Sequence, residues 1–365
     1  MGDLRKHLKT VALLLLTSIV LWRLWRGMSW IEVRHSFKQA NGFLLASAIV
    51  VSSATNLLRA FRWRALLSPL SPASVSEAFA ATNIGIGTSF VFGAAVGEVI
   101  RPLALTLLSR RVRPAASFLT IVVERVCDLS VLFILFGLSL LWLHRLTGHS
   151  AERAQASAAG IILLVVPFLG IGLLVLLNRR LTESSNGIAE RLAGWRIAPN
   201  RARRAVSHVL QQLASALSLL SNERQLTVVT FWTAAQWLSV ILTNWLVLRA
   251  FGLPFGIKET VLVMCCGLVG SLVPTPGGAA GAFHAAISAG LVLLGVTLER
   301  AAAISIAAHL AGFIPALTFG SYYLLSGSVS LARLRHEMSR AEELSESGGG
   351  HSIEVQLERR ITIGK

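Results

Sequence analysis

Two apolar segments interrupted by glycine and proline most constrain the fold of this chain. They read TNIGIGTSFVFGAAVGEVIRP at 82–102 and GLVGSLVPTPGGAAGAFHAA at 267–286, and both are too broken for an ordinary membrane-spanning helix. Interrupted helix is tolerated at membrane depth only where its freed backbone N–H and C=O groups face protein or water instead of lipid. Paired segments of this kind in the two halves of a chain indicate a substrate site between them.

The composition is that of a polytopic membrane protein. Of the 365 residues, 54% are hydrophobic and only 14% are charged, and the mean hydropathy is +0.65. The formal net charge is nevertheless +16, and most of the 34 basic residues are arginine. Ordinary cytoplasmic loops account for many arginines, but arginine is also the better bidentate partner for phosphate. We therefore expect membrane lipids with anionic or lipid-linked headgroups as partners, and no nucleic acid.

Six apolar runs each approach the roughly 20 residues that a bilayer requires. Arginine clusters place the loops around the first interrupted segment and the long loop 178–224 in the cytoplasm, and 29–41 becomes an outer loop. Both termini are then cytoplasmic, and the two interrupted segments enter from opposite faces. The sequence thus predicts an all-α polytopic fold with two re-entrant hairpins, eight membrane segments in all, in inverted repeats at about 42–143 and 226–325. The six predicted spans are 11–28, 42–61, 117–143, 157–177, 226–248 and 301–325.

The remaining parts of the chain offer no catalytic domain. The basic loop 178–224 has apolar residues at helical spacing, so we expect an amphipathic interfacial helix there. The membrane domain covers 1–326, and the polar tail 327–365 is expected to be disordered. The cysteines lack metal-ligand spacing, so we expect small core residues, no metal site and no cofactor. They are Cys127, Cys265 and Cys266.

Ionisable residues inside apolar segments cost about 2.5–3.5 kcal/mol each at a helix centre and therefore need a reason. Glu98 and Arg101 are three residues apart and can share one helix face, and Glu124, Arg125 and Asp128 form a second group. One interpretation is that these charges pair and lock the first hairpin against the next helix. The other is that they form a polar path for a substrate, and the two interpretations are compatible.

In the second half of the chain, the break PTPGG is more specific than any single charge, because proline removes a backbone donor and glycine allows close approach. His284 follows this break, where exposed N–H groups would favour an anion, and we interpret it as a site residue. His309, in the last predicted span, is interpreted as a packing residue. The candidate residues in this half are Pro274, Pro276, Gly277, Gly278 and His284.

Four motifs occur in a recognisable order: RAFRWRALL (59–67), GEVIRP (97–102), ERVCD (124–128) and PTPGG (274–278). Over roughly 10–325 the chain resembles the flippase-like transmembrane domain of the lysylphosphatidylglycerol synthases. The resemblance implies an integral membrane domain of eight segments, implicated in moving lipids between leaflets. The family's GE-x-x-R lies on Gly97, Glu98 and Arg101, its ER-x-x-D on Glu124, Arg125 and Asp128, and its PGG on Pro276, Gly277 and Gly278.

The chain departs from the family pattern in two places. Members commonly follow PGG with a glycine and a glutamate, whereas this chain reads GGAAGAFH and has His284 near the place of that glutamate. The first hairpin reads VFGAAVGE and lacks the proline that the family often shows before its glycine. Some members carry an aminoacyl-transferase domain; none follows residue 325 here, so lipid aminoacylation is not expected.

The leading hypothesis is a flippase or transporter of lipid-like amphiphiles in the plasma membrane, rather than an enzyme, with a polar groove at the midplane. Arg62, Arg101 and Arg125 would contact phosphate. The acidic residues Glu98, Glu124 and Asp128 would hold those arginines or receive a cationic headgroup. Two alternatives stay open, a membrane-embedded transferase acting on lipid-linked sugar and a non-transporting partner of cell-envelope enzymes. A homo-oligomer is compatible with each.

Overall fold

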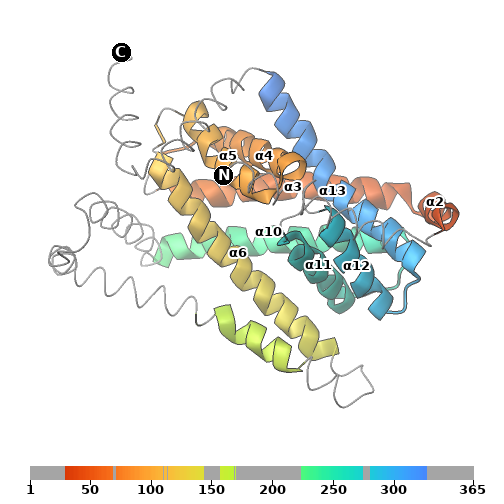
Figure 1. The fold of residues 1–365 in the computed structure, drawn as a ribbon. Coiled ribbons are helices and arrows are strands. Elements are labelled where there is room, and N and C mark those ends of the chain that lie inside the picture. Colours follow the sequence, from red (N-terminus) through yellow and green to blue (C-terminus); the bar gives the residue numbers. More distant parts are fainter. Residues whose placement is uncertain are drawn as a thin grey trace, which may run out of the picture.

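The described part of the chain is helical. The computed structural model describes residues 29–68, 71–109, 111–112, 114–143, 157–167, 169, 223–273 and 280–326, and no strand occurs among them. Four helices are long and apolar enough to cross a membrane: α3 (Gly42–Leu67), α6 (Pro114–Leu143), α10 (Glu223–Ala250) and α13 (Leu298–Leu325). The shorter helices are α2 (Trp30–Gln39), α4 (Val75–Phe92), α5 (Ala94–Leu108), α11 (Ile257–Ser271), α12 (Ala280–Leu293) and one at Ser157–Pro167 (Figure 1). The predicted all-α class is therefore confirmed for these residues.

The four long helices correspond to four of the predicted spans. The first predicted span, nearly all of the predicted amphipathic loop, residues 274–279 and the tail lie outside the described residues, and the span predicted at 157–177 is described only in its first part. The structure adds α2, which the sequence analysis assigned to a loop. This helix begins after Ser29, whose hydroxyl accepts a bond from Glu32 N, and it buries Val33 in a core that α13 shares.

The central pair of helices, α3 and α10, pack together in antiparallel directions (Figure 1). At one end Asn41 N donates to Ala250 O at 2.8 Å. At the other end Gln225 Nε2 donates to Ala65 O at 2.7 Å. These contacts define two ends of the molecule, which we call the Ala250 end and the Ala65 end.

The helices α4 and α5 form a hairpin that begins and ends at the Ala65 end. α4 runs antiparallel to α13, because Phe79 contacts Tyr323 near the end of α13 whereas Phe90 contacts His309 near its middle. The chain turns back at Gly93, whose φ of +100° is open to glycine and rarely to other residues. With 18 and 15 residues, the two helices are about 27 and 22 Å long, shorter than a bilayer core of about 30 Å.

The helices α11 and α12 form a second hairpin, at the Ala250 end. α11 follows the end of α10 directly, and α12 brings Leu291 back to the core cluster that contains Leu248. Phe283 of α12 contacts His309, the same residue that Phe90 of the first hairpin contacts. The two hairpins therefore extend from opposite ends and approach each other at the middle of α13.

The packed pairs of helices follow a two-fold pattern. In the first half, α3 packs on α4 and α6, and α5 packs on α6. In the second half, α10 packs on α11 and α13, and α12 packs on α13. Across the halves, α4 packs on α13 and α11 packs on α6, so exchanging α3, α4, α5 and α6 with α10, α11, α12 and α13 reproduces these contacts. α13 additionally packs on α2 and α3.

Small residues allow the two helices of each hairpin to approach closely. A Cβ atom on Gly97 of α5 would lie 1.8 Å from Ser89 Oγ and 2.2 Å from Gly85 O of α4. A Cβ atom on Gly270 of α11 would lie 2.6 Å from Ala282 O of α12. Between helices in lipid, such close contact supplies van der Waals packing, since lipid tails are as apolar as leucine. Each hairpin is therefore a closely packed two-helix unit.

Candidate functional site

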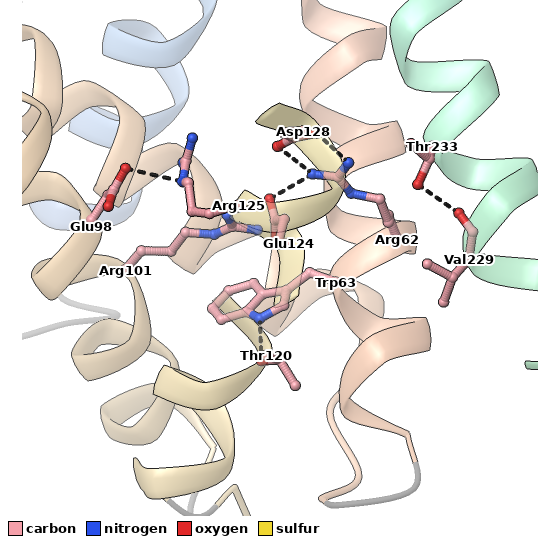
Figure 2. A network of polar contacts seen from close by, with 10 residues as sticks. All are labelled: Arg62, Trp63, Glu98, Arg101, Thr120, Glu124, Arg125, Asp128, Val229 and Thr233. Atoms are coloured by element: carbon pink, nitrogen blue, oxygen red, sulfur yellow. Dashed lines mark hydrogen bonds and ion pairs between the residues drawn. The ribbon is translucent and has the colours of Figure 1, made fainter. Parts of the chain in front are cut away.

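A cluster of buried charges lies where α3, α5 and α6 meet (Figure 2). Arg62 of α3 is fully buried and forms a fork with Asp128 of α6, with Nη1 donating to Oδ1 at 2.6 Å and Nη2 to Oδ2 at 2.9 Å. Nη2 also donates to Glu124 Oε1 at 2.8 Å. Two parallel bonds to one carboxylate are among the stronger protein hydrogen bonds. Because an unpaired buried charge is costly, these bonds hold α3 against α6.

Arg101 of α5 joins the cluster through Glu124. Its Nη1 donates to Glu124 Oε1 at 2.8 Å, and its guanidinium carbon lies 4.1 Å from the centre of the Trp63 ring. Trp63 is in turn fixed by donating from Nε1 to Thr120 Oγ1 at 3.0 Å. Arg101 is 5% exposed, yet its Nε and Nη2 have no hydrogen-bond partner among the described residues. Since buried polar groups are nearly always hydrogen-bonded, two unsatisfied donors on one arginine are unusual.

A second ion pair lies at the exposed rim of the cluster. Arg125 Nε donates to Glu98 Oε1 at 3.0 Å, and the two side chains are 46% and 41% exposed. Glu98 and Arg101 thus reach different residues of α6, since Glu98 meets Arg125 and Arg101 meets Glu124 (Figure 2). Two adjacent ion pairs between helices therefore fasten the first hairpin to α6.

A cavity of about 70 Å³ lies beside the cluster, between α4, α5 and α6, and we call it the polar cavity. Five of the predicted charged residues line it, and Arg62 lies behind them, bonded to two of the five. The structure thus brings six predicted site residues from three helices to one place. The lining charges are Glu98, Arg101, Glu124, Arg125 and Asp128, together with Arg59 of α3.

A larger cavity of about 210 Å³ lies where the two hairpins approach each other, and we call it the central cavity. Its wall includes Phe90 of the first hairpin, Ser271 and Phe283 of the second, and residues of α3, α10 and α13. Arg59 and Ile86 line both cavities, so the cavities are adjacent. The Arg59 side chain makes no hydrogen bond or ion pair with another residue in the described part of the chain.

The two histidines of the second half lie against each other. Their ring centroids are 5.0 Å apart, and His284 Nδ1 lies 3.1 Å from Ser305 Oγ. His309 packs against Phe90 and Phe283 and also lines the central cavity. The other candidates of this half, Pro274, Pro276, Gly277 and Gly278, lie outside the described residues.

A comparison with known families agrees with the motifs. The sequence model of the family described as lysylphosphatidylglycerol synthase TM region matches residues 10–320, which include both hairpins. The chain belongs to this family. It is therefore a multi-pass membrane protein, as its four membrane-length helices also indicate. Searches of curated proteins and of solved structures returned no match.

The motifs expected for the lysylphosphatidylglycerol synthase family have distinct positions in the structure. In GE-x-x-R, Gly97 permits the close contact of α5 with α4, while Glu98 and Arg101 face α6. In ER-x-x-D, Glu124 and Asp128 bind the buried arginines. The two motifs therefore meet across α5 and α6 and build the polar cavity.

Sequence reasoning missed the polar residues that α3 contributes to the central cavity. Ser52, Thr55, Asn56 and Arg59 line it. They follow the spacing i, i+3, i+4, i+7 of one helix face, and Arg62 continues the same stripe. A search for polar residues at helical spacing inside this apolar span would have found them, whereas a search for isolated charges did not.

Proposed function

We propose that the protein is a lipid flippase or a transporter of lipid-like amphiphiles. It passes a phosphate-bearing headgroup across the membrane midplane through the polar and central cavities, while the lipid tails stay in the bilayer. The observation that carries the proposal is Arg101, which lines the polar cavity at 5% exposure with two unpaired donors. The planar fork of arginine matches the oxygens of a phosphate group.

The energetics of headgroup movement support this assignment. Moving an ion of this size from water to a medium of dielectric constant about 4 costs on the order of 20 kcal/mol in the idealised case. Arginine donors and neutral polar groups along a path replace part of the lost hydration. Such groups line both cavities, and Arg59 connects them.

The proposed topology follows the architecture. Each hairpin re-enters the membrane from the face where it began, and the segments 42–143 and 226–325 form inverted repeats around a midplane site. The exchange of packed helix pairs supports this repeat. The exposed Arg64 and Arg111 lie near the Ala65 end, which we assign to the cytoplasmic face of the plasma membrane.

The test is lipid movement by the purified protein in liposomes without any donor sugar. Phosphatidylglycerol with a fluorescent tail is followed by quenching of the outer-leaflet label with an impermeant reductant. We expect the inner-leaflet label to become accessible faster with the protein than in empty liposomes or with Arg101→Ala. Movement that occurs only with a sugar donor, and with a glycolipid product, would replace the flippase with the transferase alternative.

A further inference from the structure

The central cavity differs from the polar cavity in its charges. Among the described residues that line it, Arg59 is charged and no carboxylate is present. The carboxylates of the neighbouring polar cavity are each held by arginine, with Glu124 and Asp128 bonded to Arg62 and Glu98 bonded to Arg125. Each of these carboxylates is therefore already paired with an arginine, although Glu124 Oε2 has no hydrogen-bond partner among the described residues.

Several neutral polar groups of the central cavity present acceptor oxygens. Thr243, Asn244 and Ser271 each donate a hydrogen bond to a carbonyl oxygen of their own helix, at 2.6–2.9 Å. Asn56 Nδ2 donates to Asn83 Oδ1 at 2.9 Å. Because the hydroxyl protons of Thr243 and Ser271 are already donated, these groups offer lone pairs to a ligand. The side-chain oxygens of Asn56 and Asn244 also accept, and each amide keeps a second N–H donor.

A ligand that fits this wall combines an anion with hydrogen-bond donors. We infer that the central cavity selects a phosphodiester amphiphile whose headgroup is uncharged and bears hydroxyls. Its phosphate pairs with Arg59, and its hydroxyls donate to the acceptor oxygens of α10 and of the α11 tip. The inference rests on the proposed function and specifies its substrate class.

The charge of the central cavity disfavours a cationic headgroup. Acceptor oxygens would tolerate an ammonium group, but Arg59 would repel it and no carboxylate of this wall would compensate. In a medium of low dielectric constant such a like-charge contact is a strong element of selectivity. The structure therefore assigns to this protein a substrate without an aminoacyl cation.

The first experiment measures binding of tail-matched lipids to the purified full-length protein by native mass spectrometry. Phosphatidylglycerol, phosphatidylmethanol and lysylphosphatidylglycerol compare the hydroxyl-bearing anion with the same anion lacking hydroxyls and with the cationic headgroup. We expect phosphatidylglycerol to bind about tenfold more tightly than phosphatidylmethanol, as the loss of one or two hydrogen bonds predicts. It should also bind more tightly than lysylphosphatidylglycerol, whose cation is repelled by Arg59. Phosphatidylinositol is added as a separate arm, so that a preference for a ring polyol is distinguished from one for glycerol.

Two variants test the residues that carry the selectivity. Thr243→Val removes an acceptor with little change of shape and should bring phosphatidylglycerol and phosphatidylmethanol closer together. Its control is Thr227→Val, which removes the same kind of hydroxyl from an exposed site on the same helix. Asn244→Asp should shift the preference toward lysylphosphatidylglycerol. Its control is Asn41→Asp, because Asn41 is an exposed helix N-cap where aspartate serves equally well.

The outcomes separate this inference from the proposed function. Equal binding of the three lipids, or no change with Thr243→Val in a folded protein, would overturn the selectivity. If the Asn244→Asp variant does not fold, the binding of phosphatidylglycerol and phosphatidylmethanol to Thr243→Val alone tests the selectivity. Selective binding without lipid movement in liposomes would support the selectivity and reject the flippase. Movement of all three lipids at one rate would support the flippase and reject the selectivity.

Discussion

Arg62 and Arg101 are both buried, but their donors are used differently. Arg62 gives three hydrogen bonds to two carboxylates, and Asp128 has both of its oxygens in bonds to it. Arg101 gives one bond, to an oxygen of Glu124 that Arg62 also binds. Removing Arg101 therefore leaves Glu124 paired, whereas removing Arg62 leaves Asp128 without its partner.

Arg62→Ala should destabilise the fold by about 3–5 kcal/mol, the usual cost of deleting one partner of a buried pair. The measurement is thermal unfolding of the purified variant in detergent. Arg64→Ala, at an exposed position two residues away, is the control and should unfold like the parent protein. Equal stability of the two variants would show that the cluster does not hold α3 against α6.

Arg101→Ala should impair lipid movement much more than it impairs stability, because Glu124 keeps Arg62 as its partner. Arg101→Lys should also be a poor transporter, since a point charge lacks the fork geometry. Both variants are assayed in liposomes after their unfolding temperatures have been measured. A variant that fails to accumulate would identify Arg101 as a structural residue instead.

At the scale of elements, the sequence located the interrupted segments but not the form of the interruption. α4 continues through Gly85 and Gly87, because each packs against a neighbouring helix, and the turn occurs at Gly93. The spacing of charged residues also identified Glu98 and Arg101 but not the residues that they pair with. Those partners lie on α6 and depend on how α5 crosses that helix. α2 was missed because it is short and rich in charged residues, so its low hydropathy suggested a loop although its apolar residues have helical spacing.

Gly97→Ala should destabilise the first hairpin by about 1–3 kcal/mol, because the added methyl group would meet the backbone oxygen of Gly85. Gly312→Ala is the matched control, since its Cβ would have only an ordinary contact of 3.8 Å with Phe90. Alanine in that helix interior should be neutral or slightly stabilising. Unfolding temperatures in detergent compare the two, and a similar effect of both substitutions would contradict the close α4–α5 contact.

At the scale of the whole molecule, hydropathy and arginine clusters predicted the four long helices within a few residues. Apolar runs of this length have few other stable states. The central cavity could not be predicted in the same way, because its wall combines residues of both hairpins with α3, α10 and α13. Neutral polar residues such as Thr243 and Asn244 cost little free energy in a membrane span, so their presence in the sequence is only a weak indication of a site.

The proposed topology predicts the labelling of four exposed positions by an impermeant thiol reagent. Cysteines at Ser68 and Arg111 should both be shielded from outside, and cysteines at Lys258 and Thr297 should both react. Labelling of only one member of either pair would convert that hairpin into an ordinary span. The background protein has all three native cysteines replaced, Cys127, Cys265 and Cys266.

The charge cluster also has a consequence for lipid movement under a membrane voltage. Four arginines and three carboxylates meet among the described residues of the polar cavity and its rear wall, which leaves one net positive charge when all are ionised. A phosphodiester brings one negative charge, so the site is neutral while it is occupied, but the cluster stays in place when the lipid moves on. A membrane potential acts on each charge carried across the membrane with about 2.3 kcal/mol per 100 mV. Movement of a phosphodiester lipid should therefore respond to an imposed potassium diffusion potential and reverse its preference with the sign of that potential, and a dianionic phosphomonoester should respond about twice as strongly.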